Sequence, residues 1–390
     1  MKRILRIKTL LPYLVVVLAV NHNAFAQVFV FPKFLNFDEV MFGQKLSRFL
    51  VISNQGDTTI VVNDINLSHS YFQVSDTSFF IDPYDSQIVV VTFSPQEQGV
   101  ADGTVSIFVN VPSDTTLEVD LTGWSPIDLN NELLRNEFSM PISFNLQKSR
   151  EFLLHLQVSS ETSWSIPDSE SAVLTIYIDS TGGSQNQDIV LFKGDEFFIY
   201  KVSLGRIDSG SHSIAVYFNG DKSTLGAHYI YLEKCYIIPV PLSDQNYDIY
   251  RFSPVLYGRN LISDDESNHT DTPLLLWHEV EYDGVNKWIV YSMIWSNEDG
   301  GTSSIDLMSR WGRTTDIEWI YKVKVDPGGN VLQEYFQGPG HSTSIFQGNR
   351  INDHPVLKTV TINNMVSDEG VSNYKFFLSP ERGKHEIHSR

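Results

Sequence analysis

Residues 87–111 read QIVVVTFSPQEQGVADGTVSIFVNV, and this stretch indicates a fold made of β-strands. Two runs within it, residues 87–93 and 104–111, are rich in β-branched and aromatic side chains, as is typical of strands. Residues 95–99 lie between them, and their proline and glycine favour a turn over a continuing strand. The stretch is therefore expected to form two strands separated by a turn.

The same pattern extends in both directions, from residue 28 to residue 124. Seven short strands are expected there, with turn residues between them and no segment of helical period: 35–40, 48–53, 59–66, 72–75, 87–93, 104–111 and 117–122. Seven short strands in about 95 residues are the pattern of an immunoglobulin-like sandwich.

The motifs of this segment resemble one known family. They occur in the family's order: Phe42-Gly43-Gln44, Ser53-Asn54-Gln55-Gly56, Tyr71-Phe72-Gln73-Val74, Phe93-Ser94-Pro95 with Gly99, and Leu121-Thr122-Gly123. Residues 27–125 thus resemble the ASPM/SPD-2/Hydin (ASH) domain, a relative of the major sperm protein sandwich. The resemblance implies a binding or spacer module without catalytic residues. Trp124 departs from the family, which usually has a small residue there.

The rest of the chain is also expected to be rich in strands. Residues 126–139 are interpreted as a linker with one or two helical turns over 128–134, and residues 140–246 as a β-domain. Residues 204–216 of that domain are similar to jelly-roll carbohydrate-binding modules. Residues 247–390 are expected to form a C-terminal β-sandwich with one short helix after Ser303. The predicted fold class is all-β, with tandem sandwiches.

The N-terminus predicts export. Residues 1–26 combine four basic residues, an apolar run over 10–20 and a small-residue cleavage pattern at 24–26, as in a signal peptide. The run is too short to span a bilayer, and no later segment reaches spanning length. The protein is expected in the periplasm or outside the cell.

Charge and cysteine content narrow the function further. Cleavage removes four basic and no acidic residues, which moves the formal charge from −19 to −23 and argues against nucleic acid as a partner. Cys235 is the only cysteine, so no intrachain disulfide forms, and its strand-like surroundings predict a buried, inert thiol.

Candidate functional residues gather between positions 295 and 341. Tryptophans, arginines and an amide suit a binding role: Trp295, Asn297, Arg310, Trp311, Arg313 and Trp319. Three carboxylates are candidates for catalysis: Glu298, Asp299 and Glu318. Buried charges are costly, so a cluster of this kind usually binds or catalyses.

Strand alternation gives these carboxylates an expected orientation. Ile317, Trp319 and Tyr321 are expected to face the core, which leaves Asp316 and Glu318 on the opposite face with two lysines. A solvated strand face is one interpretation. The other is a site at the strand end, in which Asp299, Asp316, Glu318 and His341 hold Ca²⁺, Mg²⁺ or Mn²⁺.

A second resemblance covers residues 270–365. Asp316-Ile317-Glu318-Trp319, then Gly340-His341 and His354-Pro355-Val356, resemble the necrosis-inducing/Vps62-like β-sandwiches. In the necrosis-inducing branch the resemblance implies a divalent-metal site. Here Asp-Ile-Glu-Trp replaces the family's Asp-Trp-Glu, and Gly312-Arg313-Thr314-Thr315 replaces its histidine-rich segment.

Three functions remain open from the sequence. The favoured one is an exported binding protein of the cell envelope or extracellular space that recognises a glycan or another envelope component through the third block. The second is a polysaccharide hydrolase or lyase that uses Glu298, Asp299, Asp316, Glu318 and His341. The third is a non-catalytic structural protein of the envelope.

Overall fold

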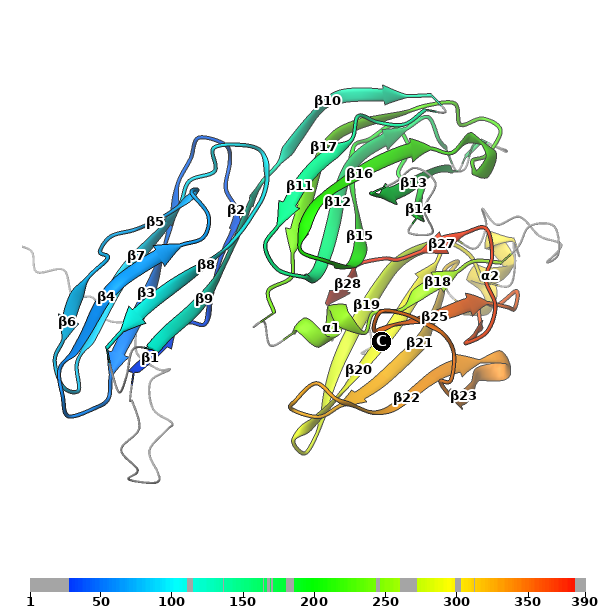
Figure 1. Cartoon of the computed structure of the whole chain (residues 1–390). Coiled ribbons are helices and arrows are strands. Elements are labelled where there is room, and N and C mark those ends of the chain that lie inside the picture. Colours follow the sequence, from blue (N-terminus) through cyan, green and yellow to red (C-terminus); the bar gives the residue numbers. More distant parts are fainter. Residues whose placement is uncertain are drawn as a thin grey trace, which may run out of the picture.

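The chain forms three β-sandwiches that follow one another in sequence (Figure 1). The computed structural model describes residues 28–110, 115–135, 137–163, 165–166, 169, 171–179, 186–242, 246–259, 272–298, 303–311 and 313–382. The expected signal peptide lies outside these residues. No helix among the described residues is long and apolar enough to cross a membrane. The prediction of an all-β tandem-sandwich fold is confirmed.

The first sandwich pairs a four-stranded sheet, β1-β3-β7-β5, with a five-stranded sheet, β2-β9-β8-β4-β6. Its strands are β1 (Val28–Phe31), β2 (Phe34–Glu39), β3 (Leu46–Asn54), β4 (Ile60–Leu67), β5 (Phe72–Val74), β6 (Phe79–Ile81), β7 (Ser86–Phe93), β8 (Gly99–Val109) and β9 (Thr115–Ser125). All seven expected strands form. The core is its own, because every buried member lies between Val30 and Leu121.

The second sandwich consists of sheets β10-β17-β12-β15 and β11-β16-β13-β14. Its elements are β10 (Ile127–Leu134), β11 (Ile142–Leu146), β12 (Arg150–Ser160), β13 (Ala172–Ile178), β14 (Asn186–Leu191), β15 (Phe198–Ile207), β16 (Gly210–Phe218), the 3₁₀ turn η1 (Gly220–Lys222) and β17 (Ile230–Pro239). Cys235 is buried in it, as expected, and burial raises the pKa of its thiol.

The expected linker is part of this second sandwich. Residues 127–134 form β10, which pairs with β17, so the prediction of helical turns in a linker is wrong there. Asn130 and Asn131 have φ angles of 54° and 56°, and the register with β17 shifts beside them. Asparagine tolerates this left-handed conformation, so the polar run makes a bulge instead of a helix.

The third sandwich has a six-stranded sheet, β23-β22-β21-β20-β19-β28, and a sheet β24-β25-β18-β27 with β26 beside β25. Its strands are β18 (Val255–Tyr257), β19 (Pro273–Asp283), β20 (Asn286–Trp295), β21 (Asp316–Val325), β22 (Val331–Gly338), β23 (Ser342–Ile345), β24 (Arg350–Ile351), β25 (His354–Thr359), β26 (Val366–Ser367), β27 (Lys375–Phe376) and β28 (Pro380–Arg382).

Short helical elements complete the third sandwich. They are α1 (Tyr247–Arg251), α2 (Ser304–Trp311) and the 3₁₀ turn η2 (Pro339–His341). The helix expected after Ser303 is α2, and Ser303 caps it. The backbone N–H of Asp306 donates to Ser303 Oγ at 3.3 Å, and Ser303 Oγ donates to the Asp306 carboxylate at 2.6 Å.

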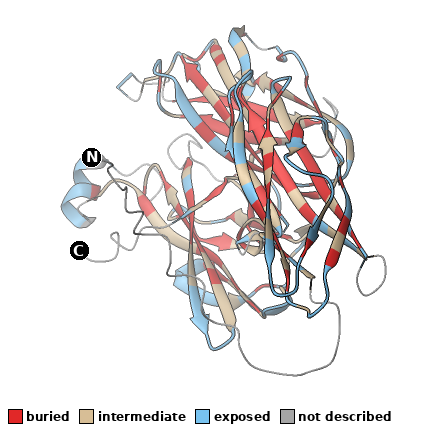
Figure 2. Cartoon of the chain, turned by 90° about the vertical axis from the view of Figure 1, so that its left-hand side faces the viewer, coloured by how far each residue is buried: buried red, intermediate tan, exposed pale blue. Residues whose placement is uncertain are grey.

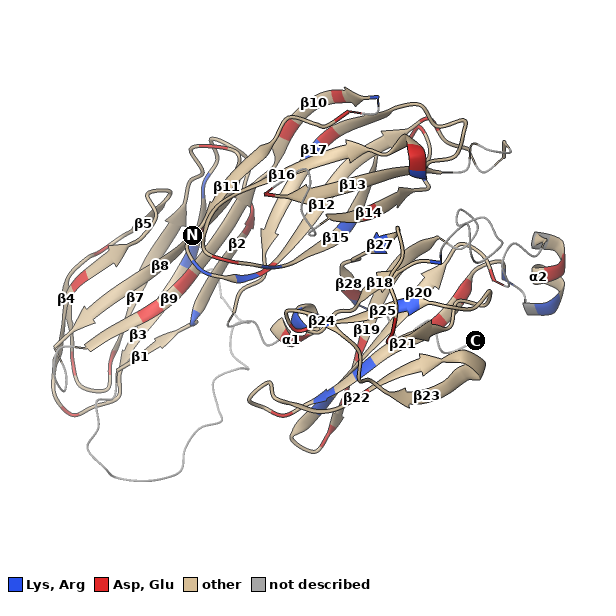
Figure 3. Ribbon diagram, turned by 45° about the vertical axis from the view of Figure 1, so that its right-hand side comes forward, with Lys and Arg blue, Asp and Glu red and all other residues tan. Residues whose placement is uncertain are grey.

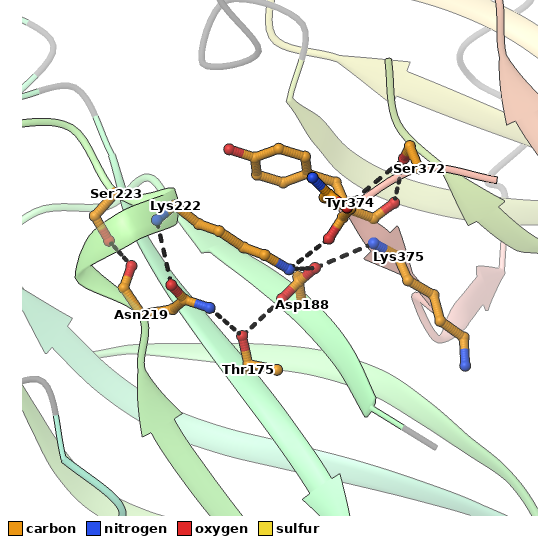
Figure 4. A network of polar contacts seen from close by, with 9 residues as sticks. Thr175, Asp188, Asn219, Lys222, Ser223, Ser372, Tyr374 and Lys375 are labelled. Carbon is orange, nitrogen blue, oxygen red and sulfur yellow. Dashed lines mark hydrogen bonds and ion pairs between the residues drawn. The ribbon is translucent and has the colours of Figure 1, made fainter. Parts of the chain in front are cut away.

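The third sandwich shares its core with the second. Val173 and Val190 of the second sandwich belong to the buried cluster of the third. A polar network also joins the second and third sandwiches (Figure 4). Asp188 accepts from Lys222 Nζ at 2.7 Å and from the Lys375 backbone N–H at 3.1 Å. Buried residues therefore continue from the second sandwich into the third, and the two form a composite unit. Along the strands, buried residues alternate in many places with more exposed ones (Figure 2).

Candidate functional site

A β-bulge in β21 decides which way its carboxylates face. Tyr321 lies opposite Tyr291 of β20, but Trp319 lies opposite the next residue, Ser292, so Ile320 is an extra residue. Ile320 and Tyr321 are both buried. An extra residue moves the side chains on one side of it to the opposite face.

The bulge overturns the expected orientation. Asp316 and Glu318 lie opposite Trp295 and Met293, which are both buried in the core, so the two carboxylates belong to the inner face. The prediction that they share a solvated face with the lysines is wrong. Trp319 takes the outer face instead, where Lys322 Nζ lies 4.9 Å from the centre of its ring.

Asp316 is buried at the base of the resulting polar cluster. It is 1% exposed, and its Oδ2 accepts a hydrogen bond from Asn364 Nδ2 at 2.9 Å. The same Nδ2 lies 3.3 Å from the backbone oxygen of Asn297. The pKa of Asp316 is raised to about 7, chiefly by burial and to a smaller extent by Glu318 and Glu298, while the Asn364 hydrogen bond opposes the rise.

Glu318 lies beside the histidine expected near it. Gln337 Nε2 donates to Glu318 Oε2 at 2.6 Å and lies 2.9 Å from His341 Nδ1. His341 Nδ1 is 3.7 Å from Glu318 Oε1, and its side chain is more than half exposed. Burial raises the pKa of Glu318, and the Gln337 hydrogen bond opposes that rise. Gln337 is a member that the sequence did not reveal.

Glu298 is held by a basic partner. Arg313 Nη2 lies 3.2 Å from Glu298 Oε2, and Arg313 Nε donates to the backbone oxygen of Thr315 at 2.8 Å. Of the expected residues, the structure thus brings together Glu298, Arg313, Asp316, Glu318 and His341, with Asn297 at the edge. We call these residues, with Gln337 and Asn364, the carboxylate cluster.

Other expected site residues lie elsewhere. Trp295 is a core residue, 1% exposed, because β20 turns alternate side chains inward, and its binding role stays a prediction. Arg310 is exposed on α2. Asp299 and the Trp311 side chain fall outside the described part of the structure. Among the described residues, no group of three or more His, Cys, Asp or Glu side chains is placed to hold a metal ion.

A larger concave site separates the second and third sandwiches, and we call it the interdomain cleft. Its volume is about 820 Å³. One wall comes from β12, β15 and β17, and the other from α1, β19, β20 and β28; Figure 1 labels these elements. The sequence does not indicate this cleft, because each wall comes from a different sandwich.

The charged side chains around the cleft balance one another. Three basic and three acidic residues line it: Lys201, Lys287, Arg382, Glu279, Glu281 and Glu381. Two of the basic groups are paired, Lys201 Nζ with Glu381 at 2.9 Å and Lys287 Nζ with Asp248 at 2.9 Å. This balance contrasts with the chain as a whole, where acidic side chains outnumber basic ones and are spread over all three sandwiches (Figure 3). A cleft of this kind suits a neutral ligand.

Two histidines in the cleft are neutral near pH 7. Burial and the nearby Lys201 lower the pKa of His155 to about 4, although Glu381 opposes the effect. His155 lies opposite Lys201 in the sheet, and its buried Nε2 has no hydrogen-bond partner within the described residues. Burial also lowers the pKa of His278, whose Nδ1 lies 3.0 Å from the backbone oxygen of Pro380. A buried polar atom without a partner is costly unless a ligand or water satisfies it.

One sequence signal could have indicated this wall. His155 interrupts the apolar run of residues 152–158, at an outward-facing position of a strand whose alternate residues fill the core. A polar side chain on the outer face of an otherwise buried strand indicates a second, partly wet environment. Residues near His155 carry no signal for the facing wall, because that wall lies more than 90 residues later in the sequence.

The comparisons with known proteins identify the first sandwich. The family model described as "Abnormal spindle-like microcephaly-assoc'd, ASPM-SPD-2-Hydin" (ASH) matches residues 25–116, which confirms the resemblance seen in the motifs. A search of curated proteins finds no significant match to this chain. The resemblance of residues 270–365 to necrosis-inducing/Vps62-like sandwiches stays a prediction.

Three solved structures illustrate the likeness. The ASH/PapD-like domain of human CEP192 is 17% identical (TM-score 0.25), over 30% of this chain and 96% of that chain. WR4, a C. elegans MSP family member, is 11% identical (TM-score 0.21), over 26% and 98%. The E. coli chaperone DraB is 10% identical (TM-score 0.23), over 32% and 74%. At these values the structural likenesses carry no argument about function.

Proposed function

We propose that this protein is an exported binding protein that holds a neutral carbohydrate in the interdomain cleft. The observation that carries the proposal is the cleft itself, a concavity of about 820 Å³ with balanced charges. Concave sites with a few convergent polar groups are where proteins usually bind small ligands. The ASH-like first sandwich supports a binding protein, since the family's module is a binding or spacer unit.

The side chains of the cleft match the chemistry of a sugar. Hydroxyl groups both donate and accept, so a sugar can use the lysine and arginine donors together with the glutamate acceptors. Tyr250 and Tyr282 also line the cleft, and tyrosine offers an apolar ring with a polar tip. The bare Nε2 of His155 would gain its missing partner from a sugar hydroxyl. A structural envelope protein has no need of such a cleft.

Titration calorimetry of residues 27–390 with neutral oligosaccharides tests the proposal. We expect His155→Gln to weaken binding by about two- to twelvefold, because one buried hydrogen bond contributes roughly 0.5–1.5 kcal/mol. His341→Gln is the matched control, because His341 belongs to the carboxylate cluster and lies outside the cleft. Absence of binding by every oligosaccharide contradicts the proposal. Equal losses in both variants contradict the assignment to the cleft.

One observation favours catalysis at the carboxylate cluster as a second candidate. Burial leaves Asp316 with a pKa of about 7, next to Glu318, and a carboxyl group of that pKa suits general acid catalysis near neutrality. Release of reducing ends from a panel of polysaccharides measures hydrolysis, and the absorbance of unsaturated products measures a lyase. Activity in the wild type that Glu318→Gln lacks would favour this candidate, and inactivity on the whole panel would reject it.

A further inference from the structure

A second cavity adjoins the interdomain cleft. Its volume is about 200 Å³, and three residues line both spaces: Lys201, Ser379 and Glu381. The two cavities therefore meet at the Lys201–Glu381 ion pair, with the polar cleft on one side and the smaller cavity on the other.

The smaller cavity is apolar. The second sandwich contributes Ile189, Phe192 and Phe198, and the third contributes Leu275 and Leu378. Phe198 and Leu275 are 38% and 37% exposed. Large apolar side chains at the interface of two sandwiches are usually covered, so this cavity leaves apolar surface open. Apolar walls that stay partly open favour an apolar group over water.

The Lys201–Glu381 ion pair between the two cavities is exposed and does not have to separate them. Lys201 Nζ and Glu381 Oε2 lie 2.9 Å apart, and the two side chains are 41% and 35% exposed. An exposed pair of this kind contributes little stability, so a ligand that passes between the cavities can displace it at small cost. Both groups can instead bond a ligand atom that lies between the two cavities.

We infer that the ligand is a neutral glycoside with an apolar chain, whose sugar occupies the interdomain cleft and whose chain enters the adjoining cavity. The sugar class rests on the proposed function, whereas the chain rests on the apolar cavity and its continuity with the cleft. The length of the chain is limited, since the cavity has about a quarter of the volume of the cleft.

A homologous series of ligands tests this inference on residues 27–390. Calorimetry compares methyl, hexyl and octyl β-glucosides, and the corresponding β-maltosides, each below its micelle concentration. We expect the affinity to rise about fourfold for each added methylene until the cavity is filled, because each buried methylene contributes roughly 0.8 kcal/mol. Binding of the methyl glycosides without any dependence on chain length overturns this inference and leaves the proposed function standing. Absence of binding throughout both series overturns both.

Two matched variants locate the chain. Leu275→Trp fills the apolar cavity and is expected to abolish the dependence on chain length while methyl glycosides still bind. Leu332→Trp is the control, since Leu332 is a partly exposed strand leucine of β22 that does not line either cavity. If Leu275→Trp melts earlier than the wild type, Phe198→Ser changes the opposite wall by removing apolar surface. Chain-length dependence that survives both cavity variants overturns the inference.

Discussion

The first and third sandwiches bury their charges in different ways. The first has a core of its own, and its one fully buried ion pair within the described residues joins Asp102 to Arg150 of the second sandwich, 3.1 Å apart. The third borrows core residues from the second and encloses carboxylates beneath β21. The ASH-like sandwich is thus joined to the second sandwich by an ion pair at their interface, which we call the border contact. The core of the third sandwich, in contrast, includes residues of the second. Both cavities are lined by residues of the second and the third sandwich.

The largest expected effect breaks the border contact. Arg150→Met leaves the Asp102 carboxylate buried without its partner, and we expect the free energy of unfolding to fall by about 3–5 kcal/mol. Urea unfolding followed by circular dichroism measures the change. Tryptophan fluorescence separates the regions, because five of the seven tryptophans belong to the third block.

A double variant is the control for this prediction. Asp102→Leu with Arg150→Met replaces the pair by apolar side chains and should recover most of the lost stability, since buried ion pairs are often no better than apolar packing. An Arg150→Met protein as stable as the wild type would show that the pair does not hold the border together.

The next effect concerns the interior of the third sandwich. In the folded protein Asp316 keeps its proton up to about pH 7, whereas in the unfolded chain it loses the proton near pH 3.8. Between these values the unfolded state binds fewer protons, so stability falls as the pH rises from about 4 to 7. Asp316→Asn removes this loss, and we expect a gain of about 2–4 kcal/mol at pH 8 and almost none at pH 4.

Urea unfolding at pH 4 and pH 8 measures this gain, with the exposed Glu369→Gln as control. Destabilisation by Asp316→Asn at pH 8 would contradict the raised pKa.

The wild type and the Asp316→Asn variant also test the predicted cation. Ca²⁺ would raise the melting temperature of the wild type relative to EDTA, but not that of the variant. Equal melting of the wild type in both buffers would reject the cation.

The smallest expected effect concerns a second ion pair between the first and second sandwiches, which is more exposed than the Asp102–Arg150 pair. Lys148 Nζ lies 2.6 Å from Asp120 Oδ1, but the two side chains are 33% and 17% exposed. Because solvent screens such a pair, Lys148→Met should change the free energy of unfolding by about 1 kcal/mol or less in the same urea experiment. A loss as large as that of Arg150→Met would mean that burial does not distinguish the two pairs.

Alternation and turn chemistry predicted much of the fold. Seven of the nine strands of the first sandwich and the helix after Ser303 depend on neighbours in sequence, so local patterns reveal them. The bulge at Ile320 does not depend on neighbours in sequence. Asp316 and Glu318 face inward because of the register in which β21 pairs with β20. The strand at 127–134 was mistaken for a helix because its asparagines suit helix caps as well as bulges.

The candidate site was predicted only where it is local. Glu318 and His341 were expected together, and they are, but Gln337 and Asn364 joined them through the packing of the two sheets. The interdomain cleft required knowledge of how β12 of one sandwich faces β19 of another. The spacing of residues along one strand does not show which strand of another sandwich lies opposite it.

The chain crosses from the first sandwich to the second with almost no slack. β9 ends at Ser125 and β10 begins at Ile127, so Pro126 alone separates two strands of different sandwiches. A pull on the first sandwich would therefore pass directly into β10 and load the β10–β17 hydrogen bonds in shear, all of them together. The one-residue connection and the buried Asp102–Arg150 pair together restrict how far the ASH-like sandwich can swing relative to the second.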